Sequence, residues 1–140
     1  MKTITWKLNL NSDPNSVFNL LTTSIGRSKF WCENTAVKDD MIHFLFPNGQ
    51  TYDSQVLTTI PDKEFHLDYF NSLVKFILVP SENSGTDLTL INENVSESEF
   101  SEINAGWVSV LMNLKAVADF QCDLRNHDPK KTWDQGYADN

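Results

Sequence analysis

The chain has 140 residues, of which 40% are hydrophobic and 11% aromatic, so it has the apolar material for one folded domain and does not read as a disordered segment. Its 11 Lys and Arg against 19 Asp and Glu give a net charge of -8. This charge argues against a nucleic-acid or membrane partner, because phosphate backbones and anionic lipids require clustered cations.

The N-terminal third is predicted to form a strand followed by a pair of short helices. Polar and apolar residues alternate over residues 3–10, the period of a strand with one buried face. Asp13 then provides a helix N-cap, and Pro14 occupies the first helical position, where its missing N–H costs nothing. The helix is predicted to run to about Thr23, and Gly26 among serines breaks it before a second helix or a turn.

Residues 36–95 are predicted to form consecutive strands joined by short polar turns. Turn-forming residues stand at 47–49, 61–63, 71–72 and 81–85, and the segments between them alternate in polarity or are apolar on both faces. Because short connections place neighbours in sequence side by side in a sheet, this pattern predicts an antiparallel meander.

A long amphipathic helix is predicted over about residues 97–122. Ser96 and Glu99 have the spacing of a capping box, which marks a helix start. Gly106 inside the helix indicates a close approach or a kink, with tight packing on the sheet as the alternative. The apolar residues that follow the start recur at intervals of three and four, as one broad stripe: Phe100, Ile103, Trp107, Val110, Leu111, Leu114, Val117 and Ala118.

The tail over residues 124–140 is polar but keeps Trp133 and Tyr137. Isolated aromatic side chains of this kind commonly anchor a returning segment to the body of a protein, and this is the structure we predict. A lid and a dimer contact are the functional alternatives for the same segment.

The order of elements predicts an α+β fold in a single domain over residues 1–140. One strand, two short helices, about six further strands and one long helix are segregated along the chain, which favours a helix layered on an antiparallel sheet over a parallel arrangement. A sheet of about seven strands must curl to cover a helix of this length. The curled face is then a concave, apolar interior.

This order of elements resembles the START-like superfamily, also called the SRPBCC, Bet v 1-like or helix-grip fold, over essentially the whole chain. The resemblance implies a seven-stranded antiparallel sheet gripping a C-terminal helix, often with a hydrophobic cavity between them. Several motifs resemble, more narrowly, the branch related to the activator of Hsp90 ATPase: Phe-Trp-Cys-Glu at 30–33, Phe-Leu-Phe-Pro-Asn-Gly at 44–49, Gly-Trp at 106–107 with Leu111, Leu114 and Lys115, Asp-Leu-Arg at 123–125 and Trp-Asp-Gln-Gly-Tyr at 133–137. Those activators carry an additional N-terminal domain that anchors to the chaperone, for which 140 residues have no room, so the resemblance does not carry Hsp90 stimulation over.

Motifs for metal or cofactor chemistry are absent from the sequence. The three histidines, His43, His66 and His127, lie far apart and outside any ligand spacing, so no metal site is predicted. No nucleophile elbow, phosphate-binding loop or dinucleotide fingerprint occurs, and no cofactor is predicted.

The two cysteines and the N-terminus indicate a cytoplasmic protein. Cys32 and Cys122 lack a C-x-x-C pattern, which argues against a disulfide framework, although a single bridge between them stays open. Cys122, near the end of the helix, is predicted to be a packed and inert thiol. Residues 1–6 lack the pattern of a secretory leader, and no apolar run reaches the length of a membrane span.

The leading hypothesis is a protein without established catalysis that binds a small apolar or aromatic molecule between the sheet and the long helix. Inward polar groups at Tyr52, Ser54, Tyr69 and Asn92 suggest trapped water or a polar end to such a pocket. The predicted ligand-binding residues come from the inward faces of the strands, the helix and the segment before them: Trp31, Phe44, Phe46, Tyr52, Tyr69, Phe76, Leu90, Asn92, Trp107, Leu111 and Leu114.

Two other classes of function stay open from the sequence. A cyclase-like or hydratase-like enzyme would use the same cavity and needs an inward titratable group, for which Tyr52 and Glu33 are the candidates. A protein-interaction module would be linked to an Hsp90-type chaperone by analogy alone. A homodimer is a further possibility, through exposed edge strands carrying Phe70, Ile77 or Val79.

Overall fold

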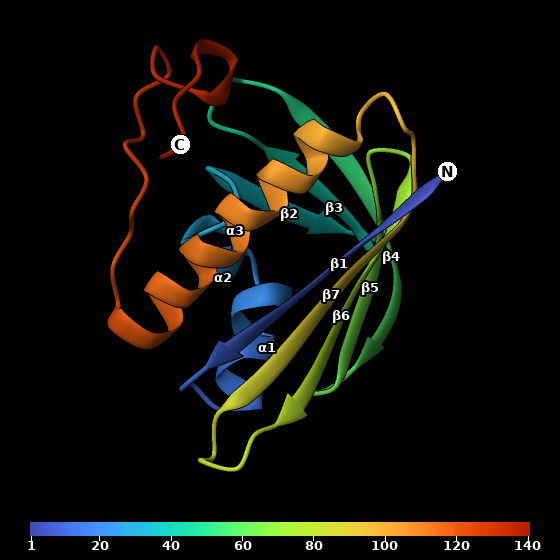
Figure 1. Cartoon of the computed structure of the whole chain (residues 1–140), viewed down its shortest axis with the longest axis vertical. Coiled ribbons are helices and arrows are strands. Elements are labelled where there is room, and N and C mark those ends of the chain that lie inside the picture. Colours follow the sequence, from blue (N-terminus) through green and yellow to red (C-terminus); the bar gives the residue numbers. More distant parts are fainter.

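The computed structural model describes residues 1–140 as a curved sheet with one long helix lying across it (Figure 1). The elements in chain order are β1 (Lys2–Leu10), α1 (Pro14–Thr22), α2 (Ser24–Ser28), β2 (Asn34–Lys38), β3 (Met41–Leu45), β4 (Thr51–Ile60), β5 (Glu64–Tyr69), β6 (Ser72–Pro80), β7 (Thr86–Val95), α3 (Phe100–Phe120) and a 3-10 helix, η1 (Trp133–Gln135).

The seven strands form one antiparallel sheet in the order β1-β7-β6-β5-β4-β3-β2. Strands β2 to β7 follow one another as a meander, as their short connections predict. β1 closes the other end by pairing with β7, in a register that sets Trp6 opposite Leu90. The predicted α+β helix-grip architecture is confirmed, with α3 crossing the sheet and with α1 and α2 beside one end of α3 (Figure 1).

The start of the helical pair follows the predicted local chemistry. Asp13 accepts a hydrogen bond from the Ser16 backbone N–H at 2.7 Å, and Pro14 is the first residue of α1. α2 then packs tightly on α1 at Gly26, where an added Cβ would lie 2.6 Å from the Leu20 Cα. Only glycine permits this approach, so Gly26 is the contact between the two helices. The break predicted at Gly26 lies instead at Thr23, which ends α1 and caps α2.

The long helix starts later than predicted, and the predicted capping box is wrong. α3 covers Phe100–Phe120 instead of about 97–122. The Ser96 hydroxyl donates to the Glu99 carboxylate at 2.7 Å, and no side chain caps the helix at Glu99. Because the two side chains bond to each other, neither satisfies a backbone N–H of the first turn.

The core lies between the sheet and α3 and is dominated by aromatic rings. The Trp31 ring is central, with ring centroids 5.0 Å from Phe44, 5.5 Å from Phe76 and 6.0 Å from Trp107. These rings join one cluster of 22 buried hydrophobic residues. Aromatic pairs at these separations stabilise a core beyond the area they bury.

The edge strands of the sheet are β1 and β2, which corrects the expected place of the exposed apolar residues. Ile77 and Val79 belong to β6, which has a strand on each side, and Phe70 lies in the turn after β5. They cannot pair across a homodimer as edge residues, because their backbone is already bonded within the sheet. None of the helices combines the length and apolarity needed to cross a bilayer.

Candidate functional site

A cavity of about 600 Å³ lies between the sheet, the first half of α3 and the C-terminal tail. Five residues of the predicted site line it: Trp31, Phe46, Tyr69, Asn92 and Trp107. Further apolar residues that line it come from the β5–β6 turn, α3 and the tail, and include Phe70, Ile103, Val110, Trp133 and Tyr137. The structure therefore brings part of the predicted set around one cavity.

The other predicted ligand-binding residues lie in the packed core outside the cavity wall. Phe44, Phe76, Leu90, Leu111 and Leu114 are each at most 5% exposed and do not line the cavity. They share the inward face with the lining residues but sit where facing side chains fill the space between helix and sheet. Their direct contact with a ligand stays a prediction, and in this structure they support the wall.

Tyr52 also stands away from the cavity. Its hydroxyl donates to the Asp68 carboxylate at 3.0 Å, and its ring stacks on Phe70 with centroids 4.4 Å apart. Phe70, with a φ of 48°, lies in the turn between β5 and β6. The Tyr52 ring also lies 6.0 Å from the Tyr69 ring, so Tyr52 supports the cavity wall through Phe70 and Tyr69.

Asn92 is the centre of a closed hydrogen-bond network behind the cavity. Its Nδ2 donates to the Ser72 hydroxyl at 2.8 Å and to the Leu73 carbonyl at 3.1 Å. Its Oδ1 accepts from the Trp107 indole N–H at 2.9 Å. Because Asn92 is fully buried, this network fixes the orientation of the Trp107 ring in the wall.

Tyr69 and Trp31 form the second polar contact of the wall. The Trp31 indole N–H donates to the Tyr69 hydroxyl at 3.1 Å. Burial raises the pKa of Tyr69, so the phenol keeps its proton across the physiological range. Tyr69 is therefore a neutral hydrogen-bonding group within an aromatic wall.

Gly106 marks the mouth of the cavity, which corrects the expected close approach or kink. α3 runs without interruption through this position, and a Cβ added at Gly106 would meet nothing within 4 Å. Gly106 lines the cavity, so its missing side chain leaves this part of the wall open.

The tail after α3 runs back along the helix and supplies one wall of the cavity (Figure 1). We call residues 121–140 the strap. Trp133 packs on Phe46 with ring centroids 6.4 Å apart, and Asn48 donates to Asp134 at 3.1 Å. The Ser109 hydroxyl of α3 donates to the Ala138 carbonyl at 3.3 Å. The predicted return of this segment to the body of the protein is confirmed.

Arg125 ties the start of the strap to the body. Its guanidinium donates to the Cys32 carbonyl at 2.8 Å and to the Ser28 carbonyl at 2.7 Å. The same group pairs with Asp123 at 3.0 Å, and Arg125 is only 7% exposed. A buried, forked cation that satisfies two backbone carbonyls is a strong and directional anchor.

An acidic and basic cluster next to Arg125 makes the strap sensitive to pH. Burial raises the pKa of Asp123, but hydrogen bonds from Arg125 and His127 outweigh burial and lower it from 3.8 to about 2. The hydrogen bond to Asp123, aided by Glu33, raises the pKa of His127 above 6.5. Asp123 therefore stabilises the folded chain above about pH 4 and loses this effect as pH falls toward 2, whereas His127 stabilises it below pH 6.5 and loses this effect as pH rises through its folded pKa.

We expect His127→Asn to lower the Tm at pH 5 and to have little effect at pH 8.5. Asparagine tolerates the left-handed backbone at this position, where φ is 55°, so the variant tests the side chain rather than the turn. The effect is small, because Asp123 and His127 are both 40% exposed and water screens the pair. Thermal unfolding of both proteins at the two pH values measures it, and an equal Tm difference at both would contradict it.

The remaining chemical candidates lie outside the cavity wall. Burial raises the pKa of the Cys32 thiol to about 12, which makes it unreactive. Cys122 is exposed, contrary to the expected packing, because α3 ends at Phe120, before it. The two thiols are not bridged. Glu33 bonds His127 of the strap and, like Tyr52, does not line the cavity, so neither enzyme candidate is brought to it.

Two residues that the sequence analysis does not name also line the cavity: Asn113 of α3 and Asn140 of the strap. The available signal for Asn113 is its spacing, since it falls in a run of three-and-four intervals with Gly106, Val110 and Val117. A polar residue within an apolar stripe indicates an inward polar group. Asn140 carries no comparable signal, because its position depends on the path of the strap.

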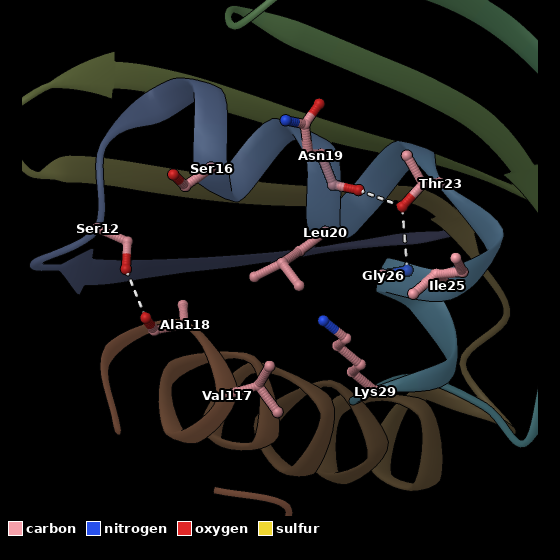
Figure 2. A pocket seen from close by; sticks show the side chains of 10 residues that line it. All are labelled: Ser12, Ser16, Asn19, Leu20, Thr23, Ile25, Gly26, Lys29, Val117 and Ala118. Carbon is pink, nitrogen blue, oxygen red and sulfur yellow. Dashed lines mark hydrogen bonds between the residues drawn. The ribbon is translucent and has the colours of Figure 1, made fainter. Parts of the chain in front are cut away.

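A second hollow of about 340 Å³ lies between α1, α2 and α3 (Figure 2). Two of its three hydroxyl groups are engaged by the chain itself: Ser12 donates to the Ala118 carbonyl at 2.6 Å, and Thr23 donates to the Asn19 carbonyl at 2.7 Å. Ile25 on its rim is 76% exposed. This smaller and less apolar hollow is a weaker candidate than the cavity under α3.

Comparisons with known proteins identify the fold. A solution structure of the Aha1 dimer from Colwellia psychrerythraea is 23% identical, with a TM-score of 0.78 over 86% of this chain and 98% of that chain. Crystal structures of a protein from Staphylococcus saprophyticus and one from Mesorhizobium loti are 15% and 17% identical, with TM-scores of 0.72 and 0.73. They match over 83% of this chain and over 90% and 96% of their own chains. No family model and no curated protein matches the sequence. At these identities the likeness shows a shared fold, and the expected fold is confirmed.

Proposed function

We propose that this chain, which has the helix-grip fold of the START-like superfamily, binds a small apolar or aromatic molecule in the cavity under α3. The observation that carries the proposal is the cavity itself, whose volume of about 600 Å³ and largely aromatic wall fit the usual dimensions of a small-molecule site. Burying the ligand against this wall contributes roughly 25 cal/mol per Å² of apolar surface removed from water.

The residues that fix the ligand are a smaller set than the sequence predicts. Trp31, Phe46, Tyr69 and Trp107 supply the aromatic surface, and Asn92 orients the Trp107 ring. Tyr52 drops out of the ligand contacts, because its hydroxyl is engaged by Asp68. The strap closes one side of the site, and the open wall at Gly106 is its mouth.

Binding is tested with the neutral fluorescent probe N-phenyl-1-naphthylamine and a substitution at the mouth. We expect the wild-type chain to bind the probe and Gly106→Phe to bind it at least about tenfold more weakly, because the new ring occupies open space in the wall. Val108→Phe is the matched control, since Val108 lies on the exposed side of the same helix and does not line the cavity. Failure of the wild-type chain to bind the probe, or equal weakening by both variants, would refute the proposal.

Self-association is a secondary proposal. It is supported by the fold shared with the Aha1 dimer and by the open backbone of edge strand β2, where Val37 is 54% exposed. Light scattering of the wild-type chain and of Val37→Lys tests it, since a lysine on the edge should convert a dimer to a monomer. A monomeric wild-type chain would contradict the proposed homodimer. The chaperone-linked alternative rests on the same likeness alone, and a pull-down that does not enrich Hsp90 would leave it unsupported.

A further inference from the structure

Polar groups at the centre of the cavity wall are engaged within the chain. Asn92 uses both amide hydrogens and its carbonyl oxygen, and the Ser72 hydroxyl donates to the Tyr69 carbonyl at 2.6 Å. The indole N–H groups of Trp31 and Trp107 are bonded as well. These groups have no donor left for a ligand. Hydrogen bonds to a ligand must therefore come from the Tyr69 hydroxyl, which accepts from Trp31 and whose own hydrogen has no acceptor within the chain, or from elsewhere on the wall.

Asn113 is the first polar residue of the wall whose side chain makes no hydrogen bond within the chain. It lies on α3, lines the cavity and is only 7% exposed, yet no hydrogen bond within the chain engages its carboxamide. The carboxamide is not closed off from solvent, since Asn140 Oδ1 is the only buried side-chain polar atom without a partner. It is therefore free to exchange hydrogen bonds with a ligand in the cavity.

Asn140 is the second polar residue of the wall with a hydrogen-bonding atom that the chain does not use. It is 7% exposed, and its Oδ1 is buried without any hydrogen-bond partner. Its Nδ2 donates to the Asn126 Oδ1 at 3.3 Å, which identifies the amide oxygen as the unpaired atom. Asn140 itself lines the cavity, so this unpaired acceptor belongs to a residue of the cavity wall.

Asn113 and Asn140 lie at the same end of the cavity. The Ser109 hydroxyl holds the Ala138 carbonyl at 3.3 Å, two residues before Asn140. Asn113 follows Ser109 by one helical turn, on the same face of α3. One carboxamide from the helix and one from the strap thus flank a common polar end.

The charge of the wall restricts the ligand further. The only ionisable acidic or basic side chains that line the cavity are the carboxylates of Glu99 and Glu102, and no lysine or arginine is present. Both glutamates are exposed and lie at the start of α3, away from Asn113. An anionic head group held at Asn113 would be buried without a compensating cation, which is unfavourable. The wall therefore favours uncharged head groups over carboxylates and phosphates.

We propose that the ligand is a neutral aromatic molecule whose head group both donates and accepts hydrogen bonds, in the manner of a carboxamide, and that Asn113 and Asn140 hold this head group. Asn113 offers a donor and an acceptor, and Asn140 offers an acceptor, which together match the hydrogens and the oxygen of a primary amide. The aromatic part of the ligand then contacts Trp107 and Tyr69. This inference rests on the proposed binding function and specifies its ligand class.

The test is displacement of N-phenyl-1-naphthylamine from the full chain by three compounds that share one ring system. Naphthalene has no head group, 2-naphthamide has a neutral one, and 2-naphthoate has a charged one. We expect 2-naphthamide to bind about tenfold more tightly than naphthalene, the gain from pairing buried amides, and 2-naphthoate to bind more weakly than 2-naphthamide.

Variants assign the preference to the named residues. Asn113→Leu and Asn140→Leu should each remove most of the advantage of 2-naphthamide and leave naphthalene binding within about twofold. Asn113→Leu should also keep or raise the Tm, because it removes a carboxamide that makes no hydrogen bond within the chain. Asn83→Leu, in the exposed loop between β6 and β7, is the matched control and should preserve the advantage.

The possible outcomes distinguish failure of the proposed ligand class from failure of the proposed binding in the cavity. If naphthalene displaces the probe but 2-naphthamide binds no better, or if Asn113→Leu and Asn140→Leu keep its advantage, the ligand class is overturned and cavity binding stands. If 2-naphthoate binds as tightly as 2-naphthamide, the neutral class is overturned. If the wild-type chain does not bind the probe, both proposals fall.

Discussion

Arg125→Ala is expected to lower the free energy of unfolding by about 2 to 4 kcal/mol and to loosen the strap. The substitution leaves the Cys32 and Ser28 carbonyls without their donors at a buried position, and each unsatisfied group costs roughly 1 to 3 kcal/mol. Asp123 also loses its cationic partner. For a chain of this size the loss corresponds to a decrease in Tm of roughly 5 to 15 °C.

Thermal unfolding and limited proteolysis of the strap measure this effect together. Arg125→Lys should recover only part of the stability, because a single ammonium cannot reproduce the fork that bonds two carbonyls and a carboxylate. Lys130→Ala, on the exposed part of the same segment, is the control and should change the free energy of unfolding by less than about 0.5 kcal/mol. An Arg125→Ala protein with wild-type Tm and wild-type resistance to cleavage would show that Arg125 does not anchor the strap.

Trp107→Ala is expected to cost about 3 to 5 kcal/mol and to weaken binding of N-phenyl-1-naphthylamine more than tenfold. Trp107 is 3% exposed, so its removal deletes a large buried ring and enlarges the cavity. It also leaves the Asn92 Oδ1 without its donor. The probe loses an aromatic wall at the same time, so stability and affinity should fall together.

Trp107→Phe separates the two contributions. Phenylalanine keeps much of the packing but has no N–H, so the unpaired Asn92 oxygen alone should cost roughly 1 to 3 kcal/mol. Probe affinity should fall less than in Trp107→Ala, because a ring still faces the cavity. Gln55→Ala, on the outer face of the sheet, should leave affinity unchanged. Equal loss of affinity in Gln55→Ala and Trp107→Ala, or no loss in either, would remove Trp107 from the site.

Local features of the fold were predictable because they depend on neighbours in sequence. The Asp13 cap, the division into two short helices and the meander of β2 to β7 each follow from short-range chemistry, and the structure contains them. The prediction of a capping box was wrong for an equally local reason. Ser96 and Glu99 had the right spacing, but their side chains bond each other in preference to the backbone.

The sequence predicted which face of the sheet carries the candidate site, but not which residues of that face line the cavity. Alternation places Phe44, Tyr69, Phe76 and Asn92 on the inner side of the sheet, and this direction is set by the strand period. Which of these residues line the cavity depends on the distance between α3 and the sheet at each position along the helix. Phe44 and Phe76 meet close neighbours, whereas Tyr69 and Asn92 lie where the first half of α3 leaves space.

The sequence by itself determined the α+β layering, the order of the strands after the helical pair, the inward aromatic face and the absence of any signature for metal or cofactor chemistry. Only the tertiary structure decided that Gly106 opens a mouth, that Arg125 anchors the strap, and that Asn113 and Asn140 line the same cavity. The physical reason is the separation in sequence over which each kind of interaction acts. Periodicity and capping act over a few residues, whereas the Arg125 anchor joins residues 93 and 97 positions apart, a pairing that depends on the packed path of the whole chain.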